Sequence, residues 1–110
     1  MGAHLWFVLT DPDPRTGLVV LVMLVSVKPH TDKTVQLNAG DHRFVEHASN
    51  VDYGTATFAP AARLEQRIAS GLITLDVDLT AKVLERIRDG LLTSSRTINA
   101  ISEYCRARWS

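Results

Sequence analysis

The residues best suited to chemistry lie in the middle of this 110-residue chain. Three of its four histidines, His30, His42 and His47, fall within eighteen residues of one another. Asp41 and Arg43 flank His42. Imidazole is the side chain that most readily moves protons near neutral pH, and a guanidinium can stabilise the charge that builds on a phosphate in a transition state. These groups are the base, the acid and the cation that a metal-independent ribonuclease needs to work through the ribose 2′-hydroxyl.

The same residues also have a purely structural interpretation. Histidines and charges in surface loops are usually solvated, and Asp41 can cap a turn after Gly40 because aspartate readily bonds nearby backbone amides. The roles of Ser26 and Tyr53 are equally undecided, since a polar group at a strand end either binds a ligand or bonds the backbone. Residue types alone therefore leave both interpretations standing.

Several familiar site motifs are missing from the sequence. It contains a single cysteine, Cys105, and it has no His-Glu-x-x-His, no Gly-x-Gly-x-x-Gly or Gly-x-x-x-x-Gly-Lys loop and no Gly-x-Ser-x-Gly. We therefore expect neither a metal ion nor a cofactor. A lone thiol cannot form an internal disulfide, which favours a reducing compartment.

Length and composition predict one domain covering residues 1–110. Hydrophobic residues make up 45% of the chain and charged residues 22%, near the averages for globular proteins. The most apolar stretch, Gly17–Val27, is much shorter than the about 20 residues that a membrane-spanning helix needs. We expect no membrane contact and a cytoplasmic location. The formal net charge is zero, so binding to RNA would need a local basic patch.

The elements that must position these side chains begin with short strands. Apolar runs, β-branched residues and intervening turn sequences predict strands over Ala3–Leu9, Leu18–Val27, Thr34–Leu37, Val51–Phe58 and Leu72–Leu75. Two Asp-Pro pairs and a closing glycine predict a turn over Thr10–Gly17, so the first two strands are expected to form an antiparallel hairpin. Alternation in the fourth strand predicts one shared face for Val51, Tyr53, Thr55 and Thr57. Alanine-rich Ala61–Ser70 fits either a helix or a bent extension of that strand. The segment Asp41–Asn50 has no clean periodicity, and we expect Phe44 and Val45 to anchor it to the core.

The C-terminal third, residues 79–110, is predicted to be helical. Apolar residues recur at three- and four-residue steps, which is typical of an amphipathic helix over 79–91, at Leu79, Val83, Leu84, Ile87 and Leu91. Gly90 lies close to the expected end of this helix. A second helix is expected from near Ser95, with one face made of Ile98, Ile101 and Tyr104. Five or six short strands followed by helices fit an α+β class built on a small, partly closed barrel.

Five segments carry a resemblance to a known family, namely HLWFVLTDP, LVVLVMLVSVK, TVQLNAGDH, SNVDYGTATF and GLITLDVDLTAKVLERIRDGL. In order and character they are similar to the strands and final helix of the PemK/MazF-like growth-inhibitor toxins of toxin–antitoxin systems. The resemblance covers about residues 4–92. It implies an SH3-like barrel with a C-terminal helix, an endoribonuclease acting on single-stranded RNA, a homodimer, and a cognate antitoxin whose peptide fills the RNA groove.

The chain departs from the pattern of that family where catalysis is concerned. The arginine that usually starts the early strand corresponds to His4, and the hydroxyl that ends the next strand corresponds to Ser26. No arginine lies in Val51–Phe58, where some members carry a catalytic one. Either a histidine-based site replaces the usual set, or the nuclease activity has been lost.

Two hypotheses follow from this choice. In the first, an RNA-cleaving toxin, we expect His42 to act as general acid or base, Ser26 to position the phosphate and Arg43 to supply the cation. Asp41 would orient a histidine. Further catalytic candidates are His4 and His47, and the expected RNA contacts are Lys28, Lys33 and Tyr53. In the second, the chain is a non-catalytic module of the same barrel that recognises a peptide or a nucleic acid, so the sequence leaves open whether the protein is an enzyme.

Overall fold

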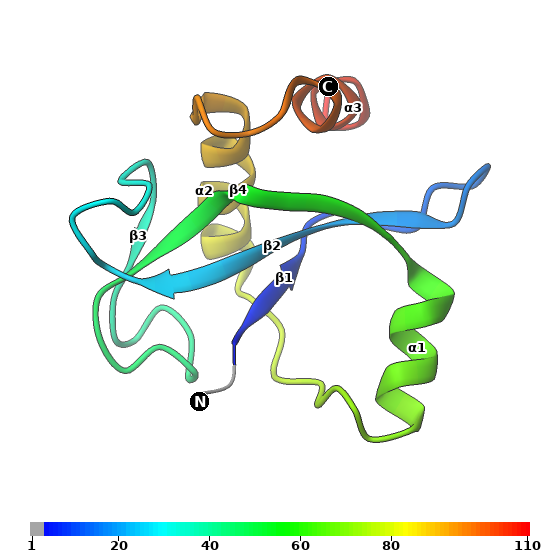
Figure 1. The fold of residues 1–110 in the computed structure, drawn as a ribbon, viewed down its shortest axis with the longest axis horizontal. Coiled ribbons are helices and arrows are strands. Elements are labelled where there is room, and N and C mark those ends of the chain that lie inside the picture. Colours follow the sequence, from blue (N-terminus) through cyan, green and yellow to red (C-terminus); the bar gives the residue numbers. More distant parts are fainter. Residues whose placement is uncertain (1–3) are drawn as a thin grey trace.

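In residues 4–110, which the computed structural model describes, four strands and three helices form an α+β fold (Figure 1). The strands are β1 (Trp6–Val8), β2 (Leu18–Ser26), β3 (Gln36–Leu37) and β4 (Ser49–Pro60), and the helices are α1 (Ala61–Ala69), α2 (Ala81–Thr93) and α3 (Asn99–Arg108). The strands make one antiparallel sheet in the order β1-β2-β4-β3. Ala3, where the first predicted strand begins, lies outside the described residues.

The sequence Thr10–Gly17 forms the expected turn between β1 and β2. The carboxylate of Asp13 accepts hydrogen bonds from the backbone N–H groups of Arg15 and Thr16, at 2.8 and 3.1 Å. Gly17 closes the turn with a φ of 72°, a conformation that a residue without a Cβ adopts at no steric cost. The two strands therefore form the antiparallel hairpin that their sequence predicts.

The long pair of β2 and β4 carries an irregularity. Leu21 pairs with Thr57, whereas Met23 pairs with Asp52, so β4 holds extra residues opposite a short stretch of β2. Thr55 spans this bulge, because its Oγ1 accepts a hydrogen bond from the Met23 N–H at 3.0 Å and donates one to the Asp52 carbonyl at 2.6 Å. A bulge of this kind interrupts the inward–outward alternation of a strand.

The bulge explains why one prediction about β4 is wrong. The four alternate residues expected on one face do not share it: Val51 and Tyr53 are buried, whereas Thr55 is half-buried and Thr57 exposed. Beyond the bulge the inward position passes to Ala56, which is buried. Alternation read from sequence holds only as long as the pairing register does.

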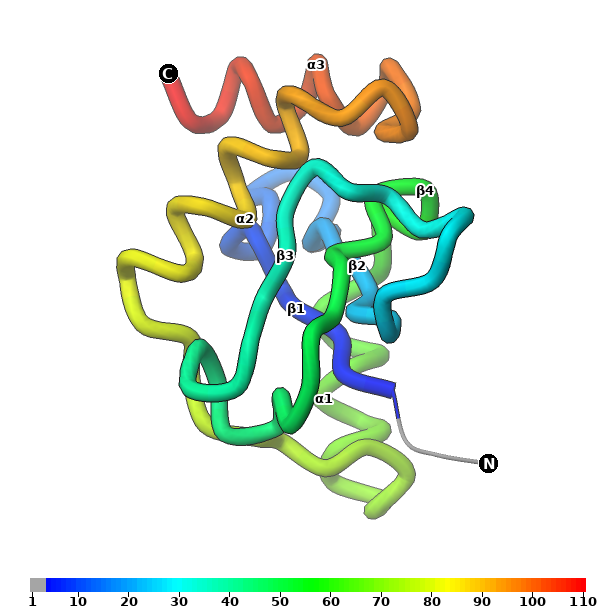
Figure 2. Tube along the Cα trace, turned by 90° about the vertical axis from the view of Figure 1, so that its left-hand side faces the viewer, coloured from blue at the N-terminus to red at the C-terminus, as the bar shows by residue number. Residues whose placement is uncertain are grey.

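The core lies between the sheet and the two C-terminal helices. In the view of Figure 1 α2 lies behind the sheet and α3 crosses above it, and Figure 2 shows α1 at the opposite, lower end of the molecule. Burial raises the pKa of the Cys105 thiol to about 11, so this side chain packs as a small apolar residue. The fully buried side chains include Leu9, Val20, Val22, Leu37, Val51, Tyr53, Ile87, Leu91, Ile101 and Cys105.

The sheet stays open, and the predicted barrel of five to six strands is corrected to four strands within the described residues. After Pro60 the chain enters α1 instead of extending β4, and Gly71 ends that helix with a φ of 81°. The predicted strand Leu72–Leu75 is wrong: this segment is irregular, and Leu72 and Leu75 are 78% and 74% exposed. α1 carries the chain away from the end of β4 (Figure 1), so this segment does not continue the sheet.

The predicted main helix is confirmed as α2, two residues later than expected at each end. The Thr80 side chain caps it by accepting a hydrogen bond from the Val83 N–H at 3.3 Å. Val83 and Ile87 are buried as predicted, and Leu79 and Leu84 pack against the same core. Gly90 lies in the last turn of α2, close to the end of the helix as predicted, and the helix continues to Thr93.

The second predicted helix begins at Asn99, four residues later than the expected start near Ser95. The preceding residues are used for side-chain bonds instead: Thr97 Oγ1 donates to the Leu91 carbonyl at 2.8 Å. Of the face predicted for this helix, Ile101 is buried and Tyr104 half-buried, while Ile98 is 58% exposed. None of the helices in residues 4–110 is both long and apolar enough to cross a bilayer.

Candidate functional site

The antiparallel register gathers the candidate residues at one end of the sheet. β1 begins there, β2 ends there and β4 begins there, with Ser26 paired to Ser49 and the Leu24 N–H bonded to the Leu5 carbonyl at 3.0 Å. His4 precedes Leu5 and therefore reaches the same end. The connection between β3 and β4, residues 38–48, carries the central histidines to it.

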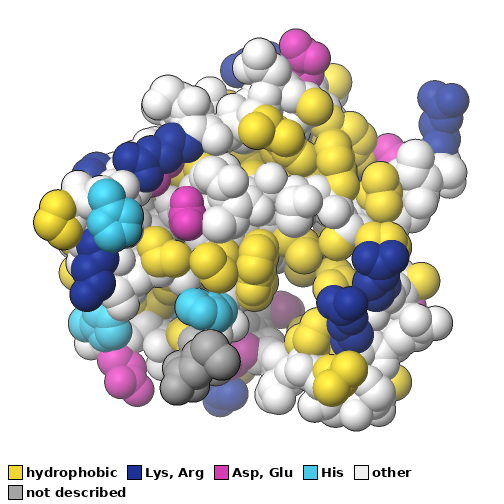
Figure 3. Space-filling view, in the orientation of Figure 1, with side chains coloured by type: hydrophobic (Ala, Val, Ile, Leu, Met, Phe, Trp, Pro, Cys, Tyr) yellow, Lys and Arg dark blue, Asp and Glu magenta, His cyan; other side chains and the backbone are white. Residues whose placement is uncertain are grey.

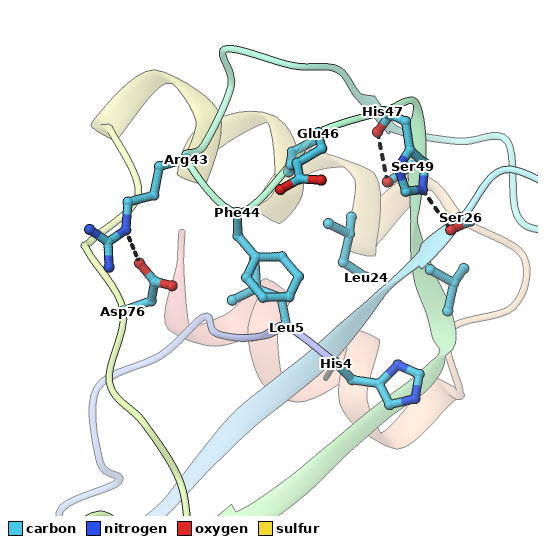
Figure 4. Close-up of a pocket in the computed structure, with 12 residues that line it drawn as sticks. His4, Leu5, Leu24, Ser26, Arg43, Phe44, Glu46, His47, Ser49 and Asp76 are labelled. Atoms are coloured by element: carbon cyan, nitrogen blue, oxygen red, sulfur yellow. Dashed lines mark hydrogen bonds and ion pairs between the residues drawn. The ribbon is translucent and has the colours of Figure 1, made fainter. Parts of the chain in front are cut away.

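A cleft of about 730 Å³ opens at this end of the sheet (Figure 4). Its middle is apolar, and Figure 4 shows Phe44 standing between the two polar ends. Phe44 is 38% exposed and lines the cleft, while its neighbour Val45 is buried, so only the second of the two predicted anchors enters the core. The lining residues are His4, Leu5, Leu24, Val25, Ser26, Arg43, Phe44, Val45, Glu46, His47, Ser49 and Asp76.

One polar end of the cleft is a hydroxyl–imidazole pair. The Oγ of Ser26 lies 2.8 Å from Nε2 of His47, and the two share a hydrogen bond. Ser49 Oγ donates to the His47 carbonyl at 3.0 Å, which holds the backbone that carries the ring. Ser26 and His47 are both exposed. A hydroxyl bonded to an accessible imidazole is an arrangement that can hold and transfer a proton.

The other polar end is an ion pair. Arg43 Nε donates to Oδ1 of Asp76 at 2.6 Å, and the Arg43 side chain is 69% exposed. The Val77 N–H bonds the same carboxylate at 2.7 Å. This amide and, after it, Arg43 hold the pKa of Asp76 below its usual value. The carboxylate therefore stays ionised, and its negative charge offsets part of the positive charge of Arg43.

His42, the favoured catalytic histidine, does not line the cleft. It is buried, its Nδ1 accepts a hydrogen bond from the Phe44 N–H at 3.1 Å, and its Nε2 lies 2.8 Å from the Val77 carbonyl. Because an amide can only donate and a carbonyl can only accept, Nε2 must carry the proton and the ring is neutral. The His42 and Phe7 rings pack against each other in a T-shaped arrangement. The His42 ring joins residues 42–44 to the segment before α2.

Asp41 forms the turn contact that the structural interpretation predicts. Its Oδ2 accepts the Asn38 N–H at 2.7 Å, and its Oδ1 lies 3.6 Å from Arg86 Nη1. It also lies outside the cleft lining. The cleft therefore brings together four of the six predicted catalytic residues, His4, Ser26, Arg43 and His47, and leaves His42 and Asp41 behind it.

The three expected RNA contacts lie in different surroundings. Tyr53 is fully buried and donates to the Ile87 carbonyl at 2.8 Å; burial raises the pKa of its hydroxyl, so the side chain belongs to the core and not to the surface. Lys33 Nζ donates to the carbonyls of Lys28 and Thr31 and stiffens the loop after β2. Lys28 is exposed and borders a second, smaller pocket.

Sequence reasoning missed three polar residues of the cleft. Glu46 and Ser49 flank His47 in the chain, and their closeness to a candidate histidine was a usable signal. Asp76 follows Arg43 by 33 residues in an irregular segment, and no local pattern connects the two. Among residues 4–110, His, Cys, Asp and Glu side chains do not gather in a group of three that could hold a metal ion.

Comparison of the chain with protein-family models, with curated proteins and with solved structures gives no significant match in any of the three.

Proposed function

We propose that this protein is a metal-independent endoribonuclease that acts on single-stranded RNA as the toxin of a toxin–antitoxin system. The observation that supports the proposal is the cleft, which His4, Ser26, Arg43 and His47 line from three separate parts of the chain. These are the residue types that cleavage through a 2′-hydroxyl needs. The PemK/MazF-like resemblance supplies the class of substrate and the biological role.

The proposed reaction divides the work between the two histidines of the cleft. His47 takes the proton from the ribose 2′-hydroxyl, the 2′-oxygen attacks phosphorus, and the bond from phosphorus to the 5′-oxygen breaks. His4 donates a proton to the departing 5′-oxygen. The products are a 2′,3′-cyclic phosphate and a 5′-hydroxyl. Each step moves one proton and needs no metal ion.

The other cleft residues hold the substrate. Ser26, bonded to His47, positions the phosphate at one polar end of the cleft, and Arg43, at the other end, supplies the cation for the charged backbone of the strand. Phe44, exposed in the middle of the cleft, offers an aromatic face on which a base can stack, a contact worth about 1–3 kcal/mol per base. His42 serves this site indirectly in our proposal, because its two backbone bonds hold the loop that carries Arg43 and Phe44.

The finer features implied by the resemblance belong to the same proposal. The open sheet would correspond to the SH3-like barrel of PemK/MazF-like toxins, the protein would form a homodimer, and a cognate antitoxin peptide would cover the cleft. Such a toxin would act in the cytoplasm, where its RNA substrates are.

The test is incubation of the pure protein with a long single-stranded RNA in EDTA. We expect discrete fragments that end in 2′,3′-cyclic phosphate, and we expect His47→Ala to lower the cleavage rate by about 10²–10⁴-fold, the usual contribution of a general acid or base. Arg63→Ala is the matched control, because this exposed arginine of α1 does not line the cleft and its removal should leave cleavage unchanged. Intact RNA with the wild-type protein, or full activity in His47→Ala, would refute the proposed reaction.

The second candidate is a non-catalytic module that binds a peptide, and one observation favours it. α1 buries none of its residues, and three large apolar side chains on it and just after it, Ile68, Leu72 and Leu75, are exposed. Figure 3 shows hydrophobic side chains in a band from the middle of the sheet towards α1. Large exposed apolar patches mark interaction sites. Saturable binding of an apolar peptide together with no RNA cleavage would decide for this alternative.

A further inference from the structure

A second pocket, of about 220 Å³, adjoins the cleft. The two share Val25 and Ser26 at the end of β2, so Ser26 stands on the wall between them. The remaining lining residues of the second pocket are Lys28, His30, Thr31, Asp52 and Arg96. Figure 3 shows histidine and basic side chains close together on the left-hand side, beyond the end of β2.

The charges of the two pockets differ. The cleft holds one arginine, which is paired to Asp76, two histidines, His4 and His47, and a second carboxylate on Glu46. The second pocket holds two cations, Lys28 and Arg96, and one histidine against a single carboxylate. Phosphate contacts supply most of the sequence-independent affinity of nucleic-acid binding. The carboxylates of the cleft outnumber its one arginine, which disfavours a phosphate backbone there. In the second pocket lysine and arginine outnumber the one carboxylate, which favours binding of the RNA backbone.

The basic residues of the second pocket are held in place by the protein. Arg96 Nη1 donates to the His30 carbonyl at 2.9 Å, which ties the α2–α3 connection to the loop after β2. The Arg96 N–H donates to Ser94 Oγ at 3.1 Å. In the same loop Lys28 N–H donates to Thr31 Oγ1 at 3.0 Å. The cations thus lie on two segments that are bonded to one another, which reduces the ordering needed when an anion binds.

We infer that this second pocket binds a backbone phosphate of the same RNA strand, next to the phosphate that Ser26 positions in the cleft. The inference rests on the proposed function and extends it, because it assigns Arg96, His30 and Lys28 to the phosphate one step along the strand. The strand passes over Ser26 from the cleft into the pocket. Arg96 is the best residue with which to test this inference, because it lines the second pocket and does not line the cleft.

The test measures the affinity of the full chain for a single-stranded 2′-O-methyl RNA oligonucleotide, which cannot be cleaved, over a range of salt concentrations. Each phosphate contact on a single strand contributes about 0.7 to the slope of log affinity against log salt. We expect Arg96→Ala to lower that slope by about 0.7 and Arg96→Lys to keep it. The control is Arg63→Ala, which removes an exposed arginine of α1 and should change neither slope nor affinity.

The outcomes separate this inference from the proposed reaction. An unchanged slope in Arg96→Ala, or no binding of the oligonucleotide by the wild-type protein, would overturn the phosphate pocket. A lowered slope in a protein that leaves unmodified RNA intact would support the pocket while refuting the nuclease. Binding of poly-glutamate that is lost in Arg96→Ala, with RNA affinity unchanged, would assign the pocket to an acidic peptide and overturn the inference. Melting temperatures of all variants verify that they fold.

Discussion

α1 and α2 are both amphipathic helices, yet only α2 buries residues in the core. α2 buries Val83, Ile87 and Leu91 against the sheet, whereas α1 buries none of its residues and leaves Ile68 37% exposed. α1 follows directly from the last strand and points away from the helical layer (Figure 1). An apolar stripe therefore predicts which face a helix would bury, but it does not predict that a partner within the chain will cover it.

The sharpest way to test this contrast is a pair of matched isoleucines. Ile87→Ala should lower the free energy of unfolding by about 2–5 kcal/mol, because it empties a fully buried site. Ile68→Ala on α1 should change it by no more than about 0.5 kcal/mol, as surface substitutions usually do. Urea denaturation of both variants measures the difference. Equal losses would show that α1 is packed as tightly as α2.

A second prediction concerns how closely α2 fits the sheet. A Cβ on Gly90 would overlap the Tyr53 hydroxyl and lie 2.8 Å from its Cζ, and Tyr53 is fully buried. Gly90→Ala should therefore destabilise the protein by about 2 kcal/mol, the overpacking cost less the about 1 kcal/mol by which alanine favours a helix. Gly54→Ala is the control, since its Cβ meets Asp52 Oδ1 at an ordinary 3.4 Å. A Gly90→Ala variant that is as stable as wild type in urea denaturation would contradict this close packing.

The end of α2 offers a third test, through pH. Asp32 is buried, and burial acts to raise its pKa, but hydrogen bonds from Ser94 Oγ and from Thr34 outweigh it and hold the pKa below its usual value. Because the pKa is lower in the folded than in the unfolded state, Asp32 stabilises the protein above about pH 4, and this contribution is lost as the pH falls through the folded value.

Ser94→Ala should therefore cost about 1.5 kcal/mol at pH 7, the lower part of the range for a hydrogen bond to a charged group, and less at pH 3. Unfolding free energies of wild type and variant between pH 2 and 7 measure the effect, and Ser95→Ala, at the exposed neighbouring serine, is the control. The same loss at both pH values would mean that Ser94 supports the fold without acting through the Asp32 carboxylate.

The smallest effect is expected where the segment after α1 meets the cleft. Arg43 and Asp76 form an ion pair, but the Arg43 side chain is 69% exposed, and exposed pairs contribute little to stability. Arg43→Ala should leave the urea midpoint unchanged within error, while our proposed function predicts slower RNA cleavage. Arg63→Ala should change neither quantity. A clear loss of stability in Arg43→Ala alone would make this pair a structural clamp for the segment.

Sequence reasoning reached the site in part, and the histidines show why only in part. Their residue type and spacing single out His30, His42 and His47, and His47 does face the cleft. The sequence favours His42, which Asp41 and Arg43 flank. Its burial depends on the Val77 carbonyl, 35 residues away, so no local feature could have shown that both ring nitrogens are already bonded. The same holds for Tyr53, whose hydroxyl partner lies on α2.

The sequence by itself determined the features that depend on neighbours along the chain. These are the β1–β2 hairpin with its Asp13 turn, the apolar strand β2, and the helix α2 with its Thr80 cap and buried face. Short-range hydrogen bonds and a 2.0- or 3.6-residue period are sufficient to specify such elements, since each residue's role follows from those a few positions away.

Only the tertiary structure decided whether the sheet closes, which polar side chains share a cleft and which become core. The bulge in β4 shifted the inward positions, α1 removed the expected strand at Leu72–Leu75 from the sheet, and the approach of α2 fixed the surroundings of Gly90. Asp76 and Arg96 line their pockets because the fold brings distant segments of the chain together. Burial and charge pairing are properties of contacts between segments, and the chain must fold before those contacts exist.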